Sequence, residues 1–78
     1  MEKDQTCVEF GKWVRDARER RGLHQKDVAE YLGCGQSHYA RMERGERQPS
    51  FIQALHICEF LNIHFDDFVR LYRWRHPR

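Results

Sequence analysis

Residues 25–45 constrain the fold more than any other part of the chain. Val28, Ala29 and Leu32 recur at intervals of three and four residues, which is the spacing of one face of a helix. Gly33 follows, and glycine readily adopts the left-handed conformation that often ends a helix. The pattern therefore predicts a short amphipathic helix that stops in a sharp turn.

A second helix is expected directly after Gly35, which is an acceptable N-terminal cap. Tyr39 and Met42 have the spacing of an inward stripe on this helix. The side chains expected on its outward side are Gln36, Ser37, Ala40 and Arg41. The pattern indicates a helix that packs through one face and presents the other to solvent or to a partner.

The rest of the chain has helical spacing as well. Gly22 is placed to end a first helix, and Ser50 is a good N-cap for the fourth. The expected inner stripes of helices one, four and five are Phe10, Trp13, Val14 and Ala17; Phe51, Ala54, Leu55, Cys58 and Leu61; and Phe65, Phe68, Val69 and Tyr72. No segment alternates with a period of two for the length of a strand. The expected fold is an all-α, compact five-helix bundle in a single domain of 78 residues.

Several classes of protein are disfavoured by composition. No apolar run approaches the roughly 20 residues of a transmembrane helix, and the N-terminus lacks a signal-peptide core, so we expect a cytoplasmic protein that does not contact a membrane. No glycine-rich phosphate loop, carboxylate pair or supported nucleophile is present, which argues against an enzyme and predicts no cofactor. We also expect no metal site, because His56 and Cys58 are two residues apart on a helix and point in different directions.

The net charge of +2 is small, but the charges are unevenly distributed. Residues 49–69 contain three acidic side chains and neither lysine nor arginine. Residues 70–78 contain four arginines and no acid. The basic end and the acidic segment before it therefore differ sharply in their electrostatic character.

A set of residues at fixed positions carries a resemblance to a known family. The set comprises Gly11, Arg18, Gly22, Leu23, Gln25, Ala29, Gly33, Glu43, Arg44, Gly45, Pro49, Ser50, Leu61, Asn62 and Ile63. In these residues the chain resembles the helix-turn-helix proteins of the phage Cro and CI repressor type, also called the XRE-like family. The resemblance implies an N-terminal extension at residues 1–9, a lambda-repressor-like DNA-binding domain at 10–72 with helices two and three as the helix-turn-helix, and a basic tail at 73–78.

The resemblance places base-reading side chains on the third helix. Gln36 suits the N6 and N7 edge of adenine, and Arg41 suits O6 and N7 of guanine. Ser37 is expected beside them, and the methyl group of Ala40 is a candidate contact for thymine. His38 is expected to meet either a base or a phosphate, and the sequence leaves both alternatives open.

The family also implies contacts to the DNA backbone and one structural pair. The residues expected to bind phosphates are Gln25, Arg44, Arg47, Gln48 and Ser50. Ser50 has a rival role as the N-cap of the fourth helix. Arg18 and Glu43 occupy positions that pair with each other in the family, so we expect an ion pair between the first and third helices.

A homodimer is the expected assembly. Ile52, Phe60, Leu71 and Trp74 lie off the inner stripes of the last two helices, and exposed apolar patches of this kind often mark an interface. The leading functional interpretation is a sequence-specific transcription regulator, repressor or controller, that binds a roughly palindromic site in double-stranded DNA. The alternative is an antitoxin or other protein-binding module that uses DNA for autoregulation; a partner such as a toxin or RNA polymerase stays undetermined.

Overall fold

The structure is a computed structural model that describes residues 4–77, and these residues form five helices. Their bounds are α1 Gln5–Arg20, α2 Gln25–Leu32, α3 Gln36–Glu43, α4 Phe51–Leu61 and α5 Phe65–Arg75. No strand occurs between residues 4 and 77. The prediction of an all-α five-helix fold is confirmed.

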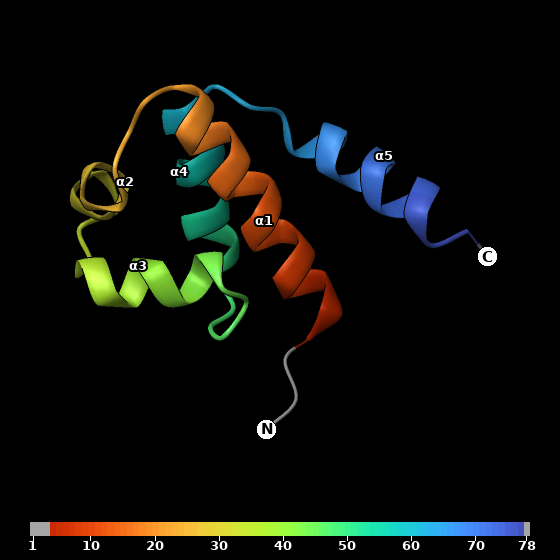
Figure 1. The fold of residues 1–78 in the computed structure, drawn as a ribbon, viewed down its shortest axis with the longest axis horizontal. Coiled ribbons are helices and arrows are strands. Elements are labelled where there is room, and N and C mark those ends of the chain that lie inside the picture. Colours follow the sequence, from red (N-terminus) through yellow and green to blue (C-terminus); the bar gives the residue numbers. More distant parts are fainter. Residues whose placement is uncertain (1–3, 78) are drawn as a thin grey trace.

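The long helix α1 runs through the molecule and separates α5 from the pair α2 and α3. Helices α2 and α3 lie on one side of α1, and α5 lies on the other side (Figure 1). Helix α4 contacts both α1 and α2. The buried core residues that these contacts bring together are Phe10, Val14, Ala17, Val28, Ala29, Tyr39, Met42, Ile57, Leu61 and Phe68. The helix-turn-helix pair is thus supported from behind by α1 and α4.

The two end helices extend beyond the domain limits expected from the sequence. Helix α1 begins at Gln5 because the Asp4 carboxylate accepts hydrogen bonds from the backbone N–H groups of Thr6 and Cys7, at 2.8 and 3.2 Å. Helix α5 continues to Arg75, so residues 73–75 are helical. Residues 5–9, expected in an N-terminal extension, are therefore part of α1, whereas residues 1–3 and 78 lie outside the described part.

The inner stripe of α4 differs from the one expected. Ile57, Cys58 and Leu61 are buried, but Phe51 is 80% exposed and Leu55 is 50% exposed. Apolar side chains lie around more than one side of this helix, so the spacing alone could not select the face that packs. The side of α4 that packs against α1 and α2 is the side of Ile57, a residue that is not in the expected stripe.

Helices α1 and α3 cross in very close contact at Gly11. A Cβ atom at this position would lie less than 3.0 Å from the backbone oxygens of Met42 and Glu43. Any residue larger than glycine would therefore push the two helix backbones apart. This crossing fixes the distance between α3 and the core.

We predict that Gly11→Ala destabilises the fold. The gain in helix propensity from glycine to alanine is about 1 kcal/mol, but forced overpacking of a tight contact costs about 1–3 kcal/mol and here meets backbone atoms that cannot rotate away. Urea denaturation followed by circular dichroism should show a net loss of stability. The neighbouring exposed residue supplies the control, since Lys12→Ala should change stability by no more than about 0.5 kcal/mol. A Gly11→Ala protein as stable as the wild type would contradict the close crossing.

Candidate nucleic-acid interface

The turn between α2 and α3 is short and well defined. Gly33 has a φ of 72°, and the N–H of Cys34 donates to the carbonyl of Ala29 at 3.0 Å. Gly35 is extended, with a φ of −75° and a ψ of 153°, and α3 starts at the next residue. The chain therefore changes direction within three residues, and α3 packs against α2 (Figure 1).

Helix α3 has a buried face and an exposed face. Tyr39 is fully buried and Met42 is 3% exposed. On the other side Gln36, Ser37 and Arg41 are exposed, and His38 is half-buried at the margin. The structure thus brings three of the expected base-reading side chains together on one accessible surface.

Ala40 is not part of this surface, which corrects the expectation from the sequence. Its exposed fraction is 9%. Ala40 precedes Glu43 by three residues, so the two share one side of α3, and that side packs into the protein. The methyl group of Ala40 is consequently not available to a thymine in this structure.

Arg18 and Glu43 form a buried, two-pronged ion pair. Arg18 Nε donates to Glu43 Oε2 at 2.6 Å, and Arg18 Nη2 donates to Oε1 at 3.1 Å. Arg18 Nη1 also donates to the carbonyl of Leu23 at 2.7 Å. The pair therefore joins α1 to α3 and to the segment that leads into α2.

Gln25 connects α2 to the same Glu43 carboxylate, so that three helices meet there. Its Nε2 donates to Glu43 Oε1 at 3.0 Å from the first position of α2. The family resemblance predicts a phosphate contact for Gln25, and nothing in the sequence predicts this hydrogen bond. An amide nitrogen carries two hydrogens, so the bond to Glu43 engages one of them and orients the side chain.

The ionisation of this cluster follows from its contacts. Burial acts to raise the pKa of Glu43, but the hydrogen bonds that it accepts, chiefly from Arg18, outweigh burial and lower its pKa below the ordinary value of 4.5. Burial together with the nearby Glu43 carboxylate raises the pKa of the Tyr39 hydroxyl. Glu43 is therefore held as a carboxylate inside a largely apolar core.

We predict an acid-sensitive component of stability that depends on Glu43. Because its pKa is lowered in the folded state, the ionised group stabilises the fold at pH values above 4.5, and this contribution is lost as the pH falls below 4.5 and through the folded pKa. Free energies of unfolding measured by urea titration between pH 7 and pH 3 should show this loss. Glu43→Gln should be less stable at neutral pH, because Arg18 loses its partner, and should have a shallower acid slope. Equal acid slopes in the two proteins would contradict the assignment.

The loop after α3 carries the remaining candidates for phosphate contacts. Gly45 has a φ of 76° and packs against Val8, while Arg44, Arg47 and Gln48 are exposed. Arg44 also forms a surface ion pair with Glu46, with Nε donating to Oε2 at 2.8 Å.

Ser50 has the capping role that the sequence analysis gave as its alternative. Its Oγ accepts from the N–H of Gln53 at 3.0 Å, and Gln53 Oε1 accepts from the N–H of Ser50 at 2.9 Å. This reciprocal pair satisfies two backbone N–H groups at the start of α4. Ser50 is exposed, so its hydroxyl is accessible as well as capping.

The expected dimer residues do not form one uniform surface. Trp74 is 80% exposed and Ile52 is 56% exposed, but Leu71 and Phe60 are half-buried. The ring of Phe60 stacks on Tyr31 of the same chain, with centroids 4.5 Å apart. Phe60 therefore already has an intramolecular partner.

Two features of residues 4–77 bear on other functions. None of the helices in this range is long and apolar enough to cross a bilayer. No group of three or more His, Cys, Asp or Glu side chains in the same range is arranged to hold a metal ion.

The comparisons with known proteins agree with the resemblance read from the sequence. The helix-turn-helix family matches residues 14–68. An uncharacterized HTH-type transcriptional regulator of Bacillus subtilis, YqaF, is 35% identical over 60 residues, which are 72% of this chain and 79% of that protein.

Solved structures give the same fold. The restriction-modification controller C.AhdI of Aeromonas hydrophila matches with a TM-score of 0.72 and 31% identity, over 80% of this chain and 94% of the controller. A second controller, C.Esp1396I, was solved as a tetramer with its natural 35-base-pair operator. It matches with a TM-score of 0.74 and 16% identity, over 88% of this chain and 91% of its own.

Proposed function

Since the chain belongs to the helix-turn-helix family of DNA-binding transcription regulators, we propose that it binds a roughly palindromic operator as a homodimer and reads the base sequence with α3. Its relatives are regulators and controllers rather than enzymes, which favours a protein that acts by binding. The observation that carries the proposal is the exposed polar side of α3 on a helix whose other side is anchored in the core.

The exposed side of α3 has the chemistry for direct readout in the major groove. Gln36 in the first turn can pair with the N6 and N7 edge of adenine, and Arg41 can donate two hydrogen bonds to guanine. Ser37 offers a hydroxyl that serves as donor or acceptor. His38 lies at the margin, where it meets a base edge or the adjacent phosphate. These side chains supply specificity because each distinguishes among base pairs.

The flanking residues supply affinity that depends little on sequence. Gln25 is oriented by Glu43 at the N-terminus of α2, where free backbone N–H groups and the helix dipole also favour a phosphate. Arg44, Arg47 and Gln48 extend this surface beyond the other end of α3. Ser50 is the weakest candidate for a phosphate contact, because its hydroxyl already caps α4. Contacts of this kind position a protein on DNA.

A two-fold dimer matches the symmetry of a palindromic site. Two copies of α3 about 34 Å apart would enter successive major grooves on one face of the duplex. The operator complex of the fold relative C.Esp1396I supports a multimeric mode of binding. The proposal leaves the direction of regulation open, because an operator-bound protein can repress or activate.

The alternative, an antitoxin or other protein-binding module, has less support, because the relatives are regulators and controllers. The end of α5 is held against α1: Thr6 Oγ1 donates to the Tyr72 hydroxyl at 3.1 Å, and His76 Nε2 lies 2.7 Å from Glu9 Oε2. These contacts keep the basic end of α5 away from α3, so the proposal assigns no DNA contact to it (Figure 1).

We predict that selection from a pool of random duplex DNA yields a palindromic motif. Gln36→Ala and Arg41→Ala should each weaken binding to that motif by about 1–3 kcal/mol and relax the preference at one position in each half-site. Arg47→Ala should instead weaken binding to all sequences alike and reduce the slope of log K against log salt by about 1 per lost contact. Sequencing of the selected pools and titrations at two salt concentrations measure both effects.

The matched control is Arg15→Ala, which removes the same charge from the exposed surface of α1. It should leave the selected motif unchanged. Weak binding that selects no motif and disappears as the salt concentration rises would overturn the proposal. The α3 surface would then be a general contact for polyanions.

A further inference from the structure

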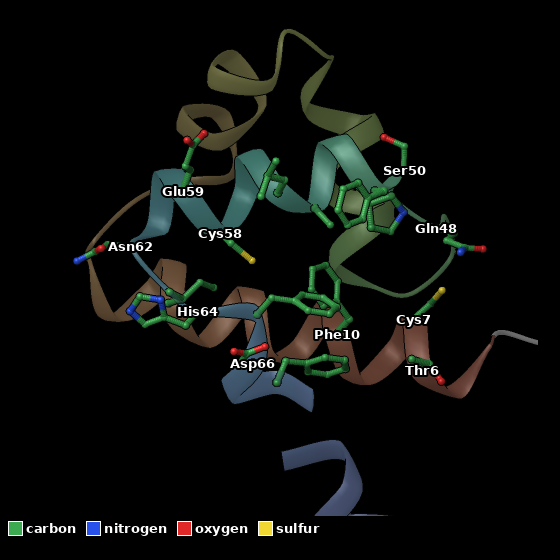
Figure 2. Close-up of a pocket in the computed structure, with 17 residues that line it drawn as sticks. Thr6, Cys7, Phe10, Gln48, Ser50, Cys58, Glu59, Asn62, His64 and Asp66 are labelled. Atoms are coloured by element: carbon green, nitrogen blue, oxygen red, sulfur yellow. The ribbon is translucent and has the colours of Figure 1, made fainter. Parts of the chain in front are cut away.

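A groove of about 790 Å³ lies between α4 and the pair α1 and α5. Phe10 of α1 and the Cys58 thiol of α4 face it from opposite sides (Figure 2). Phe51, Leu55 and Phe65 also line it, and they are 80%, 50% and 49% exposed. A monomer in water thus leaves three large apolar side chains uncovered around one concave surface, which is the usual mark of an interaction site.

The chemistry of the groove indicates a basic, aromatic occupant. Its polar lining includes Asp66, His64 and Glu59, and Glu59 also contacts Tyr31 and His56. The segment that forms most of the groove, residues 49–69, contains three acids and no lysine or arginine. Two carboxylates beside an apolar floor suit a segment with an apolar side chain between positive charges.

The end of α5 has this composition. Trp74 is 80% exposed, and Arg70 and Arg73 lie on the same helix, with Arg75 paired to Glu9 of α1. A tryptophan ring can bury some 150–250 Å² of surface, and tryptophan and arginine are both enriched among the residues that dominate interface affinity. The chain therefore contains both an unfilled groove and a matching segment.

The groove cannot receive the α5 end of its own chain. Phe65, which lines the groove, and Trp74 are nine residues apart on one continuous helix, a distance of about 14 Å along its axis. The hydrogen bond from Thr6 to the Tyr72 hydroxyl and the contact of His76 Nε2 with the Glu9 carboxylate also hold the end of α5 on α1. Only a second copy can bring Trp74 to the groove.

We propose that the groove binds the end of α5 from a second copy of this chain, with Trp74 inserted beside Phe51 and Leu55. Under two-fold symmetry the contact is made twice, since each copy gives its α5 end and receives that of its partner. The inference rests on the homodimer proposed above and specifies its interface. It replaces Phe60 by Phe51, Leu55 and Phe65 as the aromatic and aliphatic side of the contact.

Mixing of two variants tests the reciprocal contact. Phe51→Ser damages the groove, and Trp74→Ser damages the inserted segment; both residues are 80% exposed, so neither substitution should disturb the core. Each variant alone should show a dimer dissociation constant raised by about tenfold or more in sedimentation equilibrium. An equimolar mixture keeps one undamaged groove with one undamaged Trp74, so it should form heterodimers more tightly than either variant forms homodimers. Glu30→Ser, at an exposed position of α2 that does not line the groove, is the control and should dimerise as the wild type does.

The outcomes separate this inference from the proposed function. Variants that dimerise as tightly as the wild type, or a mixture no tighter than its components, would overturn the groove contact while leaving DNA reading by α3 intact. A wild type that is monomeric at all concentrations would overturn the contact and the homodimer together, and the DNA selection would then decide sequence reading separately. Dimers weakened in both variants and restored on mixing would support the contact.

Discussion

The Glu43 carboxylate is the point on which the arrangement of the helices depends. It lies at the end of α3 and accepts hydrogen bonds from Arg18 of α1 and from Gln25 of α2. Because the group is buried and charged, loss of Arg18 would leave its charge uncompensated and loss of Gln25 would leave it one hydrogen bond short, and this makes alternative helix positions costly. The close crossing at Gly11 acts at the same end of α3 and fixes the distance that the ion pair must span. These buried contacts therefore fix how the exposed side of α3 is oriented and how far α3 lies from α1.

The helices that could be predicted from sequence are those with one apolar face and clear end signals. Gly33 and Gly35 marked the turn, and Tyr39 and Met42 marked the inward side of α3. Helix α4 shows where this reasoning stops: its apolar residues surround the axis, so the buried side was decided by contact with α1 and α2, and Phe51 and Leu55 were placed inside when they are exposed. Similarly, the start of α1 depends on a cap at Asp4 that hydrophobic periodicity does not detect.

The candidate site was partly accessible to sequence reasoning for the same physical reason. Gln36, Ser37 and Arg41 are polar residues on the side of α3 opposite a buried stripe, so their exposure followed from helical geometry. The burial of Ala40 could not be predicted in this way, because a small side chain is compatible with either environment. Ala40 lies on the side of α3 on which Glu43 is buried. The hydrogen bond from Gln25 to Glu43 and the stacking of Phe60 on Tyr31 join residues far apart in sequence, and such pairs need coordinates.

The first turn of α1 connects the two surfaces that the proposed dimer would use. Thr6 and Glu9 contact Tyr72 and His76 at the end of α5, and Val8, between them in sequence, packs against Gly45 in the loop that carries Arg44 and Arg47. These contacts come from one rigid helical turn, so the α5 end and the loop after α3 hold a fixed relation to each other. A partner bound at α5 would therefore place its own α3 at a defined distance from the first. Half-site spacing in the operator is then a consequence of how α1 packs, in addition to the chemistry of α3 itself.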